Sequence, residues 1–112
     1  MCVLLKGSTT VVAPPHNLDP VLINTTGTPW LATAGTGDVL AGLAGALLAQ
    51  GLAAPQAAIA AAYLHGLAAR LAAGTSYRSG SGATFANEGG EAPIGASDVV
   101  TALHAAFRAI AP

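Results

Sequence analysis

The feature of this sequence that most constrains its fold is a glycine- and threonine-rich segment that runs directly into a regular apolar one. Residues 25–37, TTGTPWLATAGTG, follow neither a helical nor a strand period, so we expect an ordered loop there. The next segment, from Asp38 to about Gln50, predicts a helix whose larger apolar residues recur at helical spacing: Val39, Leu40, Leu43 and Leu47. Alanine and glycine fill most other positions, so neighbouring elements can approach this helix closely. Each glycine lowers the stability of the helix relative to alanine, and the packing of these neighbours against the helix must offset that loss.

A second helix is predicted from about Pro55 to Ala73. Pro55 suits a first helical turn because its missing N–H would have no partner there, and Gly74 lies just past the expected end. Apolar residues recur at fourfold spacing in this segment: Ile59, Tyr63, Leu67 and Leu71. A final helix is expected from about Asp98 to Ile110, with Ser97 as its cap.

Short runs of β-branched and aliphatic residues predict three strands before the glycine-rich loop. They lie at Val3–Leu5, Thr10–Ala13 and Val21–Asn24, and only a tight turn separates the first two. Residues 74–95 are polar and rich in glycine, which predicts a long loop between the second and third helices.

Composition narrows the classes of partner. At 112 residues the chain is one domain or part of one. Its 4 basic and 5 acidic residues give a net charge of -1, which argues against a nucleic acid or an anionic membrane as partner.

The apolar stretches Val39–Ala49 and Ile59–Leu64 are shorter than the roughly 20 residues that span a bilayer, so we interpret them as packed helices. The single Cys2 and the lack of an apolar signal core lead us to expect a reducing cytoplasm.

The clearest chemical signal is Gly35-Thr36-Gly37-Asp38, at the junction of loop and helix. The glycines permit backbone conformations that turn several N–H groups toward one point, and a helix start adds about half a unit of positive charge. We therefore predict an anion site of the kind that phosphoryl transfer requires. Asp38 has two interpretations, as the base that accepts a proton from an attacking hydroxyl or as a simple helix cap, and these residues alone do not decide between them.

A second candidate segment follows the first predicted strand: Lys6, Gly7, Ser8, Thr9 and Thr10. Its glycine and small hydroxyl residues suit the wall of a nucleotide site, with Lys6 near a phosphate and Thr10 near the base or ribose. A solvated turn is the commoner meaning of lysine and glycine at the end of a strand, and the sequence alone favours it.

The histidines and the tryptophan give weaker signals. His65 lies in the middle of a predicted helix, and we interpret it as a core or interface residue with one hydrogen bond rather than as a ligand contact. His16 and His104 have no cysteine or carboxylate at metal-ligand spacing, so no metal site is predicted from protein ligands. For Trp30, we favour a plug in the loop over a stacking platform.

Four segments, in this order, resemble the C-terminal part of the ADP-dependent NAD(P)H-hydrate dehydratases: VLLKGSTTVVA, INTTGTPWLATAGTGDVLAGLAGALLAQGL, AAYLHGLAARLA and ASDVV. Many ribokinase-like kinases share the GTGD string, whereas the preceding N-x-T-G-x-P makes the longer string much more specific. Trp30 stands where this family usually has a small residue. The resemblance implies an α/β fold in which residues 1–112 are the C-terminal part of a single ribokinase-like domain, with a mainly parallel sheet flanked by helices.

The resemblance also implies an activity. Such enzymes dehydrate the S epimer of hydrated NADH or NADPH with ADP, and they release NAD(P)H, AMP and phosphate. By position, the residues that would contact the adenine nucleotide, ADP or ATP, are Lys6, Gly7, Ser8, Thr9, Thr10 and Gly37. Asp38 would contact the hydrated nicotinamide and act as base, and magnesium would bridge the phosphates. A homo-oligomer, often a tetramer in the family, or association with a missing N-terminal half is also implied.

Two other functions remain open from the sequence. A small-molecule kinase of the same fold, of the hydroxyethylthiazole or hydroxymethylpyrimidine type, would use the same anion site on an alcohol. A non-catalytic remnant would bind nucleotide or only assemble with a partner. Because members of the family are considerably longer, we expect this chain to be a fragment, the product of a mis-set start or one piece of a split protein.

Overall fold

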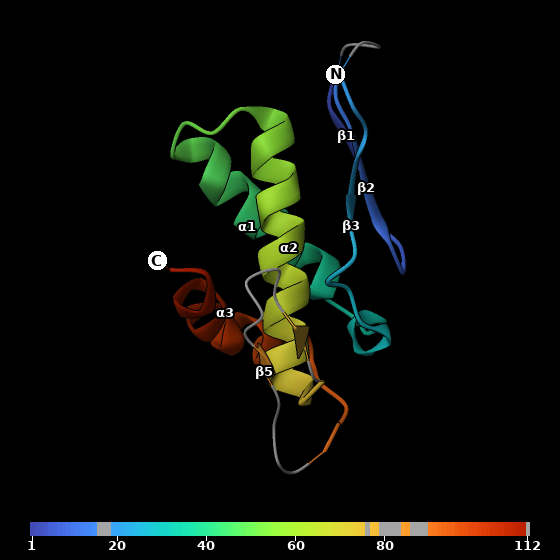
Figure 1. Cartoon of the computed structure of the whole chain (residues 1–112), viewed down its shortest axis with the longest axis vertical. Helices are drawn as coiled ribbons and strands as arrows, with labels where there is room; N and C mark the ends of the chain where they lie inside the picture. Colours follow the sequence, from blue (N-terminus) through green and yellow to red (C-terminus); the bar gives the residue numbers. More distant parts are fainter. Residues whose placement is uncertain (16–18, 76, 79–83, 86–89, 112) are drawn as a thin grey trace.

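The fold is built around one central helix. The computed structural model describes residues 1–15, 19–75, 77–78, 84–85 and 90–111. The central helix, α2 (Ala54–Ala73), has a three-stranded sheet against one side, and α1 (Thr36–Ala49) and α3 (Ala96–Ile110) pack on its other sides (Figure 1). A short 3-10 helix, η1 (Pro29–Leu31), leads from the sheet to α1.

The sheet contains β1 (Val3–Leu5), β2 (Thr10–Ala13) and β3 (Leu22–Asn24), in that order. Both pairs are antiparallel, with Val12 opposite Leu4 on one side and opposite Leu22 on the other. The mainly parallel sheet implied by the family resemblance is therefore wrong for these three strands. Parallel neighbours need a crossover of about a dozen residues or more, whereas only residues 6–9 separate β1 from β2.

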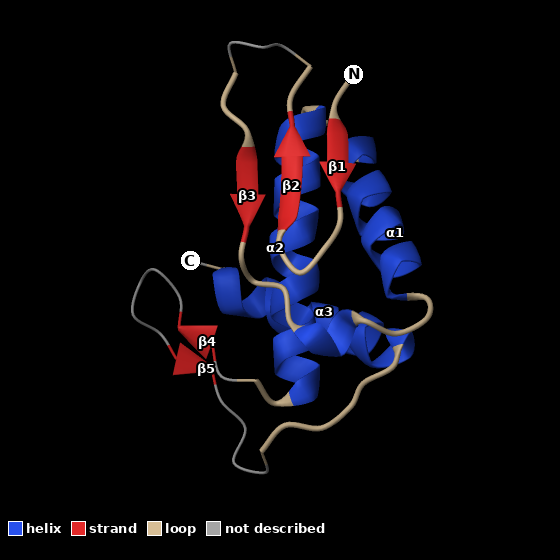
Figure 2. Cartoon of the chain, turned by 90° about the vertical axis from the view of Figure 1, so that its right-hand side faces the viewer, coloured by secondary structure: helices blue, strands red, loops and turns tan. Residues whose placement is uncertain are grey.

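Side chains alternate between the two faces of this sheet, as the strand period requires. Val12 faces α2 and is completely buried. The opposite face carries apolar side chains that remain largely exposed: Val3, Leu5 and Ile23. Figure 2 shows the helices on one face of the sheet only.

Helix α1 follows the predicted apolar spacing but begins two residues earlier than expected, at Thr36. Its N-cap is Gly35, whose φ of 87° lies in the left-handed region that glycine adopts without a steric penalty. Leu40, Leu43 and Leu47 are buried on one side of the helix, as the sequence predicted. The end of α2 also agrees with the prediction, since Gly74 adopts φ 82° directly after Ala73.

Burial of α2 extends around most of its circumference. The residues below 2% exposure include Ala57, Ala61, Leu67, Ala68 and Ala69. The fourfold series Ile59, Tyr63, Leu67 and Leu71 captures only part of this surface, because Leu67 alone of the four is buried. Small side chains let α1, α3 and the sheet approach α2 together, which explains how a chain with many alanines still forms a dense core.

The third helix is capped differently from the prediction. Gly95, in extended backbone, is the N-cap of α3, and its N–H donates to the Asp98 carboxylate over 2.8 Å. Ser97 is instead an exposed residue of the first turn. Asp98 therefore stabilises the helix start both through this bond and through its charge at the positive end.

The predicted loop of residues 74–95 contains some regular structure among its described residues. Two-residue strands β4 (Tyr77–Arg78) and β5 (Thr84–Phe85) pair antiparallel. The N–H of Ala92 donates to the carbonyl of Ala73, which brings the end of the segment back to α2 before α3 begins. Within the described part of the chain, no helix has the length and apolar character needed to cross a membrane.

Candidate functional site

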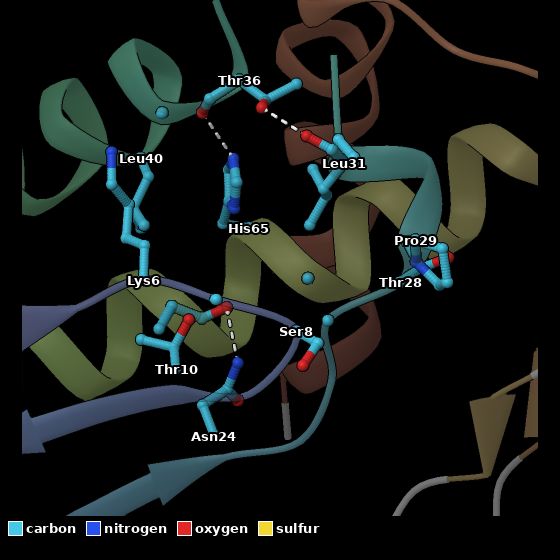
Figure 3. Close-up of a pocket in the computed structure, with 16 residues that line it drawn as sticks. Lys6, Ser8, Thr10, Asn24, Thr28, Pro29, Leu31, Thr36, Leu40 and His65 are labelled. Atoms are coloured by element: carbon cyan, nitrogen blue, oxygen red, sulfur yellow. Dashed lines mark hydrogen bonds between the residues drawn. The ribbon is translucent and has the colours of Figure 1, made fainter.

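A cavity of about 590 Å³ lies where the sheet, α1 and α2 meet (Figure 3). Its walls come from the turn between β1 and β2, the loop after β3, the first turns of α1 and the middle of α2. The predicted site residues that line it are Lys6, Gly7, Ser8, Thr10, Thr36 and Gly37. Two segments that were proposed separately from the sequence therefore share one cavity.

Three predicted site residues lie outside the described lining. Thr9 is exposed in the β1–β2 turn, and Gly35 is the exposed N-cap of α1. Asp38 is an exposed residue of the first turn of α1, directly after Gly37, which does line the cavity. Asp38 is therefore exposed to solvent rather than buried against another helix.

The start of α1 presents backbone donors to this region. The first N–H groups of a helix have no acceptor within it, and they carry the positive end of the helix dipole. The side chain of Thr36 does not cap them, because its Oγ1 lies 2.7 Å from the carbonyl oxygen of Leu31 and 3.0 Å from that of Thr33. The hydroxyl instead ties the first turn back to the preceding loop.

Lys6 reaches across the cavity to this helix start. A Cβ built on Gly37 would collide with Nζ of Lys6, so the ammonium group lies directly against the Gly37 backbone. A positive side chain thus stands beside the positive end of α1, and the two repel each other unless an anion lies between them. The geometry favours binding of a phosphate group.

His65 connects α2 to the same turn. The residue is 5% exposed, and its Nε2 lies 2.8 Å from the carbonyl oxygen of Thr36 (Figure 3). Since a carbonyl can only accept, Nε2 carries the proton and donates it. The prediction of a buried histidine with a hydrogen bond is confirmed, but His65 also lines the cavity, which the sequence did not indicate.

The electrostatic surroundings of His65 favour its neutral form. Burial lowers the pKa of His65 below its usual value of 6.5, and the charge of Lys6 lowers it further. The hydrogen bond to Thr36 acts in the opposite direction. The imidazole is therefore a neutral donor at neutral pH.

The loop after β3 is tied to α2 by a set of polar contacts that the sequence analysis missed. Asn24 donates through Nδ2 to the carbonyl of Ala62 over 3.1 Å, and Thr26 donates to that of Tyr63 over 3.0 Å. Arg70 donates to the carbonyl of Thr26 from Nε, and to that of Gly27 from Nη2 over 2.9 Å. We call Asn24, Thr26, Gly27 and Arg70 the loop clasp; it fixes one wall of the cavity.

Trp30 lies outside the described lining of the cavity. It is half-buried in η1, and its indole N–H donates to the carboxylate of Glu91 over 3.3 Å. The contact joins η1 to the segment that precedes α3. This position agrees better with a plug in the loop than with a stacking platform.

The sequence is similar to proteins of known activity. A family model described as NAD(P)H-hydrate dehydratase matches residues 1–88, which include every residue of the loop clasp and of the predicted site. The bifunctional NAD(P)H-hydrate repair enzyme Nnr of Mycobacterium leprae is 46% identical over 109 residues, which cover 96% of this chain and 20% of that protein.

A second relative gives the same indication. The ADP-dependent (S)-NAD(P)H-hydrate dehydratase of Neisseria meningitidis is 52% identical over 67 residues, which cover 60% of this chain and 22% of that protein. The chain thus spans about a fifth of the length of these two curated relatives. Because the family model covers most of its residues, the chain belongs to the NAD(P)H-hydrate dehydratase family.

Proposed function

We propose that this chain forms the nucleotide-binding and base-bearing part of an ADP-dependent dehydratase acting on the S epimer of hydrated NADH or NADPH, in the repair of nicotinamide nucleotides. The observation that carries the proposal is the placement of the Lys6 ammonium group against the first turn of α1, at the wall of the 590 Å³ cavity. The family to which the chain belongs supplies the reaction class.

The cavity suits an adenine nucleotide in size and in charge. Pockets for small molecules commonly measure about 300–1,000 Å³, and this one lies within that range. Lys6 and the amides at Thr36 and Gly37 would hold the phosphates, because charged donors and a helix start both favour anions. Gly7, Ser8 and Thr10 line the adjoining wall and would contact the rest of the nucleotide, with Thr9 and Gly35 completing the two turns.

Magnesium is proposed as a companion of the nucleotide. None of the described residues that line the cavity is a carboxylate, so phosphate oxygens and water would supply the ligands, which is a common arrangement for this ion. When bound, the ion would reduce the negative charge on the phosphates.

Asp38 is proposed as the base. It stands next to Gly37 at the cavity wall, it is open to solvent, and it would accept the hydroxyl proton of the hydrated nicotinamide. The substrate oxygen would then attack the β-phosphorus of ADP, the bond from that phosphorus to the bridging oxygen would break, and AMP would leave. Phosphate would then leave from the carbon with the electron pair of the carbon–oxygen bond, a proton would leave the neighbouring carbon, and the double bond of NADH or NADPH would be restored. The free hydroxyl group is a poor leaving group because it would depart as hydroxide, and phosphorylation removes this barrier because phosphate departs instead.

The setting of the reaction is also inferred. We infer a ribokinase-like domain in which these strands adjoin a larger, mainly parallel sheet, located in the cytoplasm and assembled as a homo-oligomer such as a tetramer or together with an N-terminal half. The matched residues make up only 20% and 22% of the two relatives, which supports a longer domain than the one that this chain provides. ADP is the expected nucleotide because the Neisseria meningitidis relative is described as ADP-dependent.

Isothermal titration of the chain with ADP tests the central claim. We expect saturable binding of ADP and weaker binding of AMP, because AMP has one phosphate fewer for Lys6 and the α1 start to hold. A folded sample, checked by circular dichroism, that binds neither nucleotide would contradict the proposal and favour a non-catalytic remnant. If the completed enzyme yields a stable phosphorylated alcohol instead of a reduced nicotinamide, a small-molecule kinase is the correct assignment.

A further inference from the structure

The first turn of α1 is held from two directions. On the loop side, the hydroxyl of Thr36 lies 2.7 Å from the carbonyl oxygen of Leu31. On the α2 side, the carbonyl oxygen of the same residue accepts from Nε2 of His65 over 2.8 Å. Thr36 is therefore fixed through both its side chain and its backbone, and both contacts meet at the edge of the cavity (Figure 3).

His65 is well placed to act as a rigid support. It belongs to α2, whose neighbouring residues Leu64, Gly66 and Leu67 are all buried. A buried ring on a well-packed helix has little freedom, so its donor direction is set by the core. Anion binding at a helix start depends on the direction of the first N–H groups, and these follow any tilt of the first turn.

We infer that His65 is a positioning residue, which holds the first turn of α1 at the distance from Lys6 where backbone amides and ammonium group can bind the same diphosphate. This inference rests on the proposed function for the identity of the ligand. It gives α2 a role in the phosphate site. His65 donates its Nε2 proton to the carbonyl of Thr36 rather than to the ligand.

A matched set of variants separates positioning from packing. In His65→Gln the side-chain amide can place a donor where Nε2 lies, whereas in His65→Asn the donor is too close to the backbone to reach Thr36. His104→Asn is the control, because it changes an exposed histidine on α3 that does not line the cavity. Circular dichroism and a thermal unfolding midpoint establish that each variant is folded.

The first measurement needs no ligand. In two-dimensional amide NMR spectra, His65→Asn should shift the signals of Thr36 and Gly37, His65→Gln should return them toward the wild-type positions, and His104→Asn should leave them unchanged. Unchanged signals in His65→Asn would overturn the inference, whatever the chain binds.

The second measurement uses ADP and adenosine as probes. His65→Asn should weaken ADP binding about five- to tenfold and leave adenosine binding unchanged, and His65→Gln should recover most of the loss, as expected for one hydrogen bond acting through geometry. Equal losses for ADP and adenosine, or no recovery in His65→Gln, would contradict positioning and indicate a general packing role.

A wild-type experiment covers the case in which His65→Asn does not fold. Saturation with ADP should shift the proton signal of the His65 imidazole N–H, since the turn it contacts holds the phosphates. A wild-type chain that binds ADP without such a shift would overturn the inference. A folded wild-type chain that binds no ADP would contradict the proposed function instead. Where His65→Asn folds, its ligand-free amide signals then decide the positioning role alone.

Discussion

The ammonium group of Lys6 occupies the space in which a side chain at Gly37 would begin. A side chain at this position would therefore have to displace the ammonium group of the lysine. The two residues are 31 positions apart in sequence and come from two separately predicted segments. Their contact brings the turn after β1 and the start of α1 to one cavity, where we propose the anion site.

Replacement of Gly37 by alanine should weaken nucleotide binding by displacing Lys6. We expect ADP affinity to fall about tenfold or more, because a charged hydrogen bond is typically worth about 1.5–3 kcal/mol. The matched control is Gly45→Ala on the same helix, where a new Cβ would meet nothing within 4 Å. Isothermal titration should find wild-type ADP affinity in the control, and equal affinities in both variants would contradict the role of the Gly37 contact.

Removal of the Lys6 charge should lower ADP affinity and make binding less sensitive to salt. In Lys6→Met the side chain keeps much of its length but loses the ammonium group, so the electrostatic part of the affinity disappears. Titrations at low and high ionic strength should show a smaller change for Lys6→Met than for the wild type. An unchanged salt dependence would show that Lys6 does not act on the phosphates.

Substitution of Gly66 should destabilise the fold rather than alter chemistry. A Cβ there would lie 2.7 Å from the carbonyl carbon of Thr26 and 2.8 Å from its oxygen, so α2 and the loop would have to separate. We expect Gly66→Ala to lower the free energy of unfolding by about 1–3 kcal/mol, which is typical of overpacking. Urea denaturation measures this, with exposed Gly45→Ala as a control that gains stability through helix propensity.

Stability should depend on pH through His65. Because the pKa of His65 is lowered by burial, the unfolded chain binds a proton more readily than the folded chain just below pH 6.5. The free energy of unfolding should therefore decrease as the pH falls through 6.5, by at most about 1.4 kcal/mol per pH unit from this group, and level off below the folded pKa. Urea denaturation on both sides of 6.5 should show a shallower decrease in His65→Gln, and identical slopes would contradict this origin.

Conversion of Asp38 to asparagine should abolish turnover while nucleotide still binds. The amide keeps the shape of the side chain but cannot accept a proton as a carboxylate does. The assay uses the chain completed by the rest of a dehydratase domain, with hydrated NADH and ADP, and follows formation of NADH. Wild-type turnover in Asp38→Asn would exclude the role of base.

The sequence predicted the helices well because their spacing and end signals are local. The leucines of α1 and Gly74 after α2 were placed correctly. The start of α1 was set two residues late because the left-handed conformation of Gly35 admits Thr36 and Gly37 into the first turn. The cap of α3 was assigned to Ser97 from its type, whereas the Asp98 carboxylate makes the bond.

Features that depend on distant contacts were missed. Nothing in the sequence indicates that Gly66 meets Thr26 or that Arg70 donates to that loop, because each pair is formed only when α2 packs on the sheet. His65 was interpreted correctly as buried, yet its bond to Thr36 needs the relative placement of two helices. The short link between β1 and β2 indicates antiparallel pairing, which the structure shows. The family resemblance led us to expect a mainly parallel sheet instead.

The loop clasp has a consequence for the order in which the site can form during synthesis. Thr26 and Arg70 are 44 positions apart, so the loop is synthesised well before the arginine that secures it. One wall of the cavity must stay open until α2 has emerged and docked. A nascent chain arrested before that point would carry both glycine-rich turns and still lack one wall of the cavity.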